Sequence, residues 1–258
     1  MNTKRPRILI SNDDGYHAKG INQLVDMLRD MADIIVCAPE SHRSGYSCAF
    51  SVEDTLRLKL RRQWEGVQVW SCNGTPVDCV KLGLHEFFAE QKPDMVIGGI
   101  NHGDNASVNA HYSGTMGVTF EGCMKYIPSC AFSLCDHHPD ADFEPMRHIV
   151  RSVVQRVLDE GLPTGVCLNV NVPVTEKVKG LKVCRMARGT WDHECEKRIH
   201  PRGFDYFWLT GTYTNDEPQA DDTDNYWLNR GYATITPTEI DVTAYQMMSK
   251  LKDWETEY

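Results

Sequence analysis

Apolar runs of strand length alternate with helix-like segments over the first two-thirds of the chain, and this alternation constrains the fold more than any other feature. It begins with RILIS, GINQLVDMLRDMA and DIIVCAP, and it continues with TPVDCVKLGLHEFFAE followed by PDMVIGGIN. Strand and helix units in this order normally build a parallel sheet covered by helices. We therefore expect an α/β fold with a doubly wound, mostly parallel sheet.

Several helices and strands can be placed from local signals. A helix is expected over 75–89, because Thr75 can act as its N-cap and Pro76 suits the first helical position, where no backbone donor is needed. Further helices are expected near 113–126 and near 142–159. SCAFSL and GVCLNVNVP have the composition of buried strands.

The pattern changes near Lys182, where KVCRMARGTW and GFDYFWLTGTY alternate like the two strands of a hairpin. The segment WDHECEKRIH within this part is interpreted as a solvated strand pair. We expect three parts, which are a catalytic core over 1–180, a β-hairpin arm with an acidic loop over 181–230, and a returning strand with a C-terminal helix over 231–258.

Composition and charge exclude several classes of protein. The chain of 258 residues is 41% apolar and 24% charged, as in ordinary globular proteins, and its formal net charge of −9 argues against a partner such as duplex nucleic acid. No segment has the length of a membrane span or a signal peptide, so we expect a cytoplasmic protein with no membrane partner. The ten cysteines include no C-x-x-C pair, which indicates a reducing compartment and no structural zinc.

Polar, glycine-containing loops follow three of the expected strands. These loops contain NDDG, ESHRSGYS and NHGDNASVNAHYSGT. In an open parallel sheet, ligands bind at the carboxyl ends of the strands. The three loops are therefore expected to meet at one edge and to form a binding site there.

Four residues of these loops could hold a metal ion. Asp13 and Asp14 supply carboxylate oxygens, Ser44 a hydroxyl, and Asn101 an amide oxygen. Such hard oxygen ligands suit one divalent ion, Mg²⁺, Mn²⁺ or Ca²⁺, and suit zinc poorly. The alternative is that the carboxylates and Ser44 only stabilise turns and that Asn101 only closes a strand end.

A phosphate site is expected where YSGT begins a helix. The backbone N–H groups of Ser113, Gly114 and Thr115 would face an anion there, and the helix dipole would favour it. A simple Ser/Thr helix cap is the alternative. Loop histidines receive no catalytic role, because most such histidines are merely solvated.

These motifs together resemble the SurE family, the survival-protein nucleotidases. The resemblance rests on ILISNDDGYHAKGI, CAPESHRSGYS, NGTPVDCV, GGINHGDN, YSGTMGVTFEG, LNVNVP and YATITPTEIDVTAY, which occur in order over nearly the whole chain. It implies a Rossmann-like, metal-dependent phosphatase of nucleoside 5′-monophosphates, and of 3′-monophosphates as a further option. It also implies that Asp13, Asp14, Ser44 and Asn101 hold the metal and that the arm builds a homodimer or homotetramer.

The expected reaction is phosphomonoester hydrolysis, with catalytic roles for Asp13, Asp14 and Asn12. Either a metal-activated water or an Asp carboxylate attacks the phosphorus. A haloacid-dehalogenase-type phosphatase is a rival reading, but NDDG lacks its Asp-x-Asp spacing. A non-catalytic nucleotide-binding module remains the alternative from another class.

Overall fold

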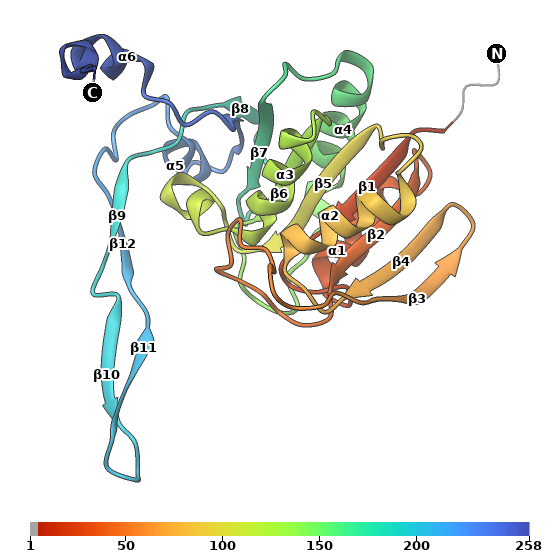
Figure 1. The fold of residues 1–258 in the computed structure, drawn as a ribbon, viewed down its shortest axis with the longest axis horizontal. Helices are drawn as coiled ribbons and strands as arrows, with labels where there is room; N and C mark the ends of the chain where they lie inside the picture. The colour runs from red at the N-terminus through yellow and green to blue at the C-terminus, as the bar shows by residue number, and fades with distance from the viewer. Residues whose placement is uncertain (1–4, 258) are drawn as a thin grey trace.

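The computed structural model describes residues 5–257, in which helices cover both faces of one large sheet and a long hairpin projects from it (Figure 1). The strands are β1 (Arg7–Ser11), β2 (Asp33–Pro39), β3 (Leu58–Trp64), β4 (Val67–Cys72), β5 (Met95–His102), β6 (Ser129–Leu134), β7 (Val166–Val172), β8 (Leu181–Val183), β9 (Gly189–Asp192), β10 (Cys195–Ile199), β11 (Asp205–Leu209), β12 (Thr212–Asn215) and β13 (Ala233–Glu239). The helices are α1 (Lys19–Leu28), α2 (Pro76–Phe87), α3 (Gly114–Met124), α4 (Arg147–Glu160), α5 (Asp224–Leu228) and α6 (Tyr245–Met248), with short 3₁₀ turns at Ser107–His111, Glu144–Met146 and Ser249–Trp254.

The strand order of the large sheet is β3-β4-β2-β1-β5-β6-β7-β13-β8. Neighbouring strands from β4 to β7 in this order run parallel, whereas β3 and β13 run antiparallel to β4 and β7. The chain passes from β1 to one side of the sheet through β2 and later returns to the other side through β5. The switch point therefore lies between β1 and β5, and the expected α/β, Rossmann-like fold is confirmed.

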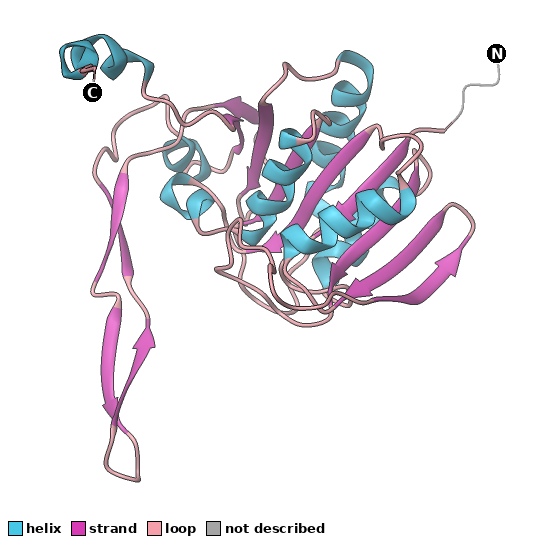
Figure 2. Ribbon diagram, in the orientation of Figure 1, coloured by secondary structure: helices cyan, strands magenta, loops and turns pink. Residues whose placement is uncertain are grey.

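The two faces of the sheet bury separate apolar clusters. Ile8 and Ile10 of β1 pack with α1 and α4, while Leu9 between them packs with Val80 of α2 and Val118 of α3. Figure 2 shows the helices on the two sides of the strands. Because alternate residues of a strand face opposite sides, the continuous apolar run of β1 is what a strand covered on both faces requires.

Helix starts follow the local chemistry that the sequence contains. Thr75 caps α2 as expected, because its Oγ1 accepts from Asp78 N at 3.1 Å and its own N–H donates to the Asp78 carboxylate at 2.8 Å. The helix expected from 142 begins only at Arg147, since a 3₁₀ turn containing Pro145 precedes it. Proline lacks a backbone donor and restricts the residue before it, which accounts for the later start. Within residues 5–257 no helix is long and apolar enough to cross a membrane.

The arm is built from two short antiparallel pairs in succession, β9 with β12 and β10 with β11. It extends away from the large sheet (Figure 1). The hairpin begins later than the sequence pattern suggests, because Leu181–Val183 pair with β13 at the edge of the large sheet instead. A free sheet edge offers these residues more backbone hydrogen bonds than an isolated ribbon would.

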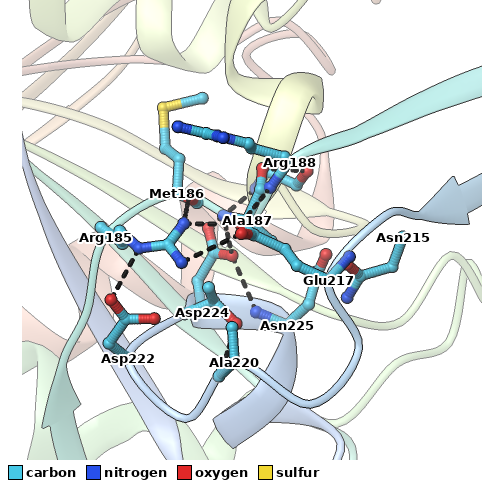
Figure 3. Close-up of polar contacts among 12 residues, drawn as sticks. Arg185, Met186, Ala187, Arg188, Asn215, Glu217, Ala220, Asp222, Asp224 and Asn225 are labelled. Atoms are coloured by element: carbon cyan, nitrogen blue, oxygen red, sulfur yellow. Dashed lines mark hydrogen bonds and ion pairs between the residues drawn. The ribbon is translucent and has the colours of Figure 1, made fainter.

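Hydrogen bonds and ion pairs fix the root of the arm (Figure 3). The Arg185 guanidinium contacts the carboxylates of Glu217 and Asp222. The buried Asp224 carboxylate accepts from the backbone N–H groups of Ser107 at 2.8 Å and Ala187 at 2.9 Å. Burial raises the pKa of Asp224, and these backbone donors oppose the rise. Asp224 thus ties the arm to the 3₁₀ turn Ser107–His111.

Replacing Asp224 by Ala should lower the free energy of unfolding by about 2–3 kcal/mol, because buried N–H groups lose their acceptor. Asp222→Ala is the matched control, since Asp222 forms an exposed ion pair with Arg185 and should change stability by less than about 1 kcal/mol. Urea unfolding of the two variants checks the difference. Equal losses in both would contradict a special role for Asp224.

Candidate active site

The loops after β1, β2 and β5 meet at the switch point of the sheet. Asp13, Ser44, Asn101 and Ser113 line one recess of about 540 Å³. The structure therefore brings together the three loops that the sequence placed at the carboxyl ends of parallel strands. A recess of this size can accommodate a small-molecule ligand.

Asp13 is a buried carboxylate, with 3% of the residue exposed. Its Oδ1 accepts from Thr115 Oγ1 at 2.6 Å, and its backbone carbonyl accepts from Arg43 N at 2.7 Å. Burial raises the pKa of Asp13 to about 6, against the Thr115 hydrogen bond, and the adjacent Asp14 carboxylate adds to the rise. A buried carboxylate beside a second one is favourable only when a cation compensates them.

Asp14 is oriented toward two histidines. Its Oδ1 lies 3.4 Å from His42 Nδ1, and its Oδ2 accepts from the backbone N–H of His102 at 3.4 Å. Both contacts are long, so they hold this carboxylate loosely. The loop after β2 and the end of β5 therefore flank the acidic pair.

The remaining oxygen ligands come from Asn101 and Ser44. Asn101 is buried, and its Nδ2 donates to Gly103 O at 2.8 Å, so its Oδ1 is oriented as the available acceptor. Ser44 lies on an exposed loop. Among residues 5–257, no group of three or more His, Cys, Asp or Glu side chains is arranged to hold a metal ion. The oxygen donors of this site fit a hard divalent ion, which accepts hydroxyl and amide oxygens beside carboxylates.

Asn12 takes a local role in this structure. Its side chain is buried, and both of its polar atoms bond to the backbone of Gly15, at 3.1 Å and 3.2 Å. Gly15 has a φ of 102°, which favours glycine. Asn12 thus fixes the turn that carries the two carboxylates rather than facing the recess directly.

The start of α3 presents free donors. Ser113 Oγ accepts from Met116 N at 3.0 Å and so caps the helix. Among the described residues, the N–H groups of Gly114 and Thr115 have no backbone acceptor, as is usual in the first helical turn. A Cβ on Gly114 would lie 2.7 Å from Asp13 Cβ, so only glycine fits against that carboxylate. Thr115 binds Asp13 through its hydroxyl, a link that the sequence pattern did not indicate.

The arm also lines the recess, which the sequence interpretation missed. Trp191, Glu194, Leu209 and Thr210 all lie at its rim. WDHECEKRIH was interpreted as a solvated strand pair, and its polar residues concealed Trp191. The signal that could have revealed it is an aromatic residue at the start of an otherwise polar segment.

Two asparagines in the LNVNV segment of β7 form hydrogen bonds with the backbone of the loop after β5. Asn171 Oδ1 accepts from Asn105 N at 2.8 Å, and Asn169 Nδ2 donates to Asn105 O at 2.7 Å. All three asparagines are buried. These hydrogen bonds fix the loop that follows Asn101, because leaving buried amides unpaired would be costly.

Comparison with known proteins decides the family. The family model described as Survival protein SurE matches residues 8–193. The chain belongs to the SurE family. A SurE member from Phocaeicola vulgatus, named 5′-nucleotidase SurE, is 52% identical over 257 residues and 100% of both chains. Another SurE of the same name, from Bacteroides fragilis, is 46% identical over 255 residues, 99% of this chain and 100% of its own.

The fold of a solved SurE structure agrees as well. The crystal structure of SurE protein from Aquifex aeolicus is 34% identical, with a TM-score of 0.83, and the match covers 97% of this chain and 100% of that one. The SurE resemblance drawn from the sequence motifs is thereby confirmed.

Proposed function

We propose that this protein is a metal-dependent nucleotidase that hydrolyses nucleoside 5′-monophosphates to nucleoside and phosphate. The relatives named 5′-nucleotidase SurE support the substrate class. The observation that carries the metal dependence is the buried Asp13 beside Asp14, at a recess that Asn101 and Ser44 also line.

Asp13, Asp14, Ser44 and Asn101 would hold the metal ion. A divalent ion bound there supplies positive charge for the phosphate and lowers the pKa of a bound water. Thr115 orients Asp13 through its 2.6 Å hydrogen bond. Asn12 fixes the turn on which the carboxylates sit.

The start of α3 would bind the phosphate. The N–H groups of Gly114 and Thr115 lie at the N-terminus of α3, where they can donate to a bound anion. The Ser113 hydroxyl can donate a hydrogen bond while it accepts one from Met116 N. These donors would stabilise the negative charge that develops on phosphate oxygens in the transition state. The attacking group is then either a water or a carboxylate of the acidic pair.

Phosphate release from a panel of nucleoside 5′- and 3′-monophosphates tests this proposal. Protein is first stripped with EDTA and then supplied with Mg²⁺, Mn²⁺ or Ca²⁺. Release that EDTA abolishes and a divalent ion restores is the expected result, and release from 3′-monophosphates would widen the specificity. Folded protein that releases no phosphate with any metal would favour the non-catalytic binding module.

We also propose that the arm and the C-terminal segment bind a second copy of this chain, in a homodimer or homotetramer. Apolar side chains are exposed along both, with Trp208 at 61%, Leu209 at 84% and Trp254 at 77% exposure. A two-stranded ribbon is marginally stable alone, so the arm needs a partner surface. A second copy offers the same unpaired apolar ribbon, which suits a symmetric contact.

Replacing Phe207 and Trp208 together by Ser should shift the protein toward monomers in analytical ultracentrifugation. The physical reason is that two large apolar side chains leave the contact between copies. Tyr126→Ser is the control, because Tyr126 is 71% exposed but lies on the body of the molecule. A wild-type protein that sediments as a monomer at micromolar concentration would contradict the proposed assembly.

A further inference from the structure

A second recess adjoins the candidate active site at the root of the arm. It has a volume of about 470 Å³ and shares Asp104, Asn109 and Trp191 with the recess that contains Asp13. These three residues therefore stand between the two spaces. A ligand whose phosphate lies near Asp13 can extend past them, and the second space is large enough for a sugar and a base.

Trp191 is held at this boundary by three neighbours. Its Nε1 donates to Asn109 Oδ1 at 2.9 Å, and its ring lies 5.9 Å from the Tyr213 ring at an angle of 57°. A Cβ on Gly211 would come within 2.9 Å of Trp191 Cε3, so the backbone there packs closely on the indole. An indole fixed in this way loses little conformational freedom when a ligand binds.

Asp104 presents an acceptor at the same boundary. Its Oδ1 accepts from Ala106 N at 3.2 Å and from Asn109 Nδ2 at 3.1 Å. Its Oδ2 has no hydrogen-bond donor among the described residues. A carboxylate oxygen in this position can accept from a hydroxyl of a ligand. Asn109 links the two residues, since it bonds both Asp104 and Trp191.

We propose that Trp191 and Asp104 form a nucleoside subsite, in which the indole stacks on the base and the carboxylate accepts from a ribose hydroxyl. The proposal rests on the proposed nucleotidase function and names how its substrate is recognised. Stacking uses the face of the base, which all bases have, so we expect this subsite to tolerate different bases and to require a nucleoside.

Steady-state kinetics with and without a base test the role of Trp191. Trp191→Ala should lower kcat/KM for adenosine 5′-monophosphate about tenfold, mainly through KM, and leave ribose 5-phosphate unchanged. Trp191→Phe should restore most of the loss, because it keeps an aromatic face. Trp64→Ala on β3 is the control. An equal loss for both substrates would mean that Trp191 only positions the 3₁₀ turn Ser107–His111, and this would overturn the proposal.

Tyr112 provides a competing position for the base, because it is exposed and lines the recess that contains Asp13. If the base stacks on Trp191 instead, Tyr112→Ala should change kcat/KM for adenosine 5′-monophosphate and for ribose 5-phosphate by the same factor. A loss confined to adenosine 5′-monophosphate in this variant, with none in Trp191→Ala, would place the base elsewhere and overturn the assignment.

Asp104→Asn tests the sugar contact. The amide oxygen can still accept from Ala106 N, while an NH₂ group replaces the free acceptor. The variant should lose about three- to tenfold in kcat/KM for adenosine 5′-monophosphate and nothing for the 2′,3′-dideoxy analogue. Equal losses on both nucleotides would contradict a contact to the ribose hydroxyls.

Calorimetric binding of adenosine, which has no phosphate, separates this proposal from the nucleotidase proposal. If wild type hydrolyses nucleotides and Trp191→Ala binds adenosine as tightly as wild type does, the subsite proposal is wrong and the nucleotidase proposal is supported. If wild type releases no phosphate but binds adenosine more tightly than Trp191→Ala does, the subsite proposal is supported and the nucleotidase proposal is wrong. Absence of both adenosine binding and turnover overturns both proposals.

Discussion

Asp13→Asn should lower phosphate release from nucleoside 5′-monophosphates by about 10³-fold while the protein remains folded. Asparagine has nearly the shape of aspartate, and its Oδ1 can still accept from Thr115 Oγ1. What it lacks is the negative charge that a divalent ion needs at this position. The loss should therefore persist at saturating Mg²⁺ or Mn²⁺.

The same substitution should make the metal-free protein more stable. The pKa of Asp13 is about 6 in the folded protein, above its ordinary value of 3.8. The proton is therefore bound more tightly in the folded state, and stability from this group is lost as the pH rises through 6. At pH 7 in EDTA, Asp13→Asn should raise the free energy of unfolding by about 2–3 kcal/mol, and at pH 4 by much less.

Urea unfolding at the two pH values, beside the activity assay, checks this pair of effects. An inactive variant that is also less stable in EDTA would mean that Asp13 supports the fold rather than the chemistry. Asp30→Asn is the control, because Arg151 lowers the pKa of Asp30 through an exposed ion pair far from the recess, so its activity should not change.

Gly114→Ala should lower activity by about 10²-fold even though alanine is the better helix former. The added Cβ would lie 2.7 Å from Asp13 Cβ and 3.0 Å from its Oδ2. Either the carboxylate or the start of α3 must move, and both belong to the proposed site. A displacement of this kind misaligns the metal ligands and the phosphate donors together.

Ser113→Ala is the matched control for this variant. It removes the cap on Met116 N and should cost about 1 kcal/mol of stability, with a smaller loss of activity than Gly114→Ala. Phosphate release by both variants at equal folded concentration provides the comparison. Full activity of Gly114→Ala would contradict the close contact between α3 and Asp13.

The main sheet could be predicted from the sequence because its strands are buried on both faces and leave unbroken apolar runs, as in Arg7–Ser11. The N-cap at Thr75 could also be predicted from the sequence, since capping depends on neighbouring residues in the chain. The start of α4 was predicted too early, because a 3₁₀ turn at Pro145 precedes the helix. Leu181–Val183 were predicted to belong to the hairpin but pair with the large sheet. The first error reflects the local restriction by Pro145, and the second depends on a tertiary neighbour, the edge strand β13.

The candidate site could be predicted in part, because its residues depend on the topology of the sheet. Asp13 and Ser44 follow strands β1 and β2, and Asn101 lies at the carboxyl end of β5, so topology alone predicts that they converge. The Thr115 bond to Asp13 and the position of Trp191 depend on how α3 and the arm pack against that edge. Contacts between segments about 100 residues apart leave no local pattern, and only the structure could supply them.

The most direct test of a metal-dependent site is anomalous X-ray scattering from crystals of the protein grown with Mn²⁺. We expect one strong peak within bonding distance of the Asp13 carboxylate, with Asp14, Ser44 or Asn101 completing the oxygen ligands. The peak should disappear in Asp13→Asn crystals. A peak elsewhere, or an ordered Mn²⁺ that survives the substitution, would contradict the proposed metal centre.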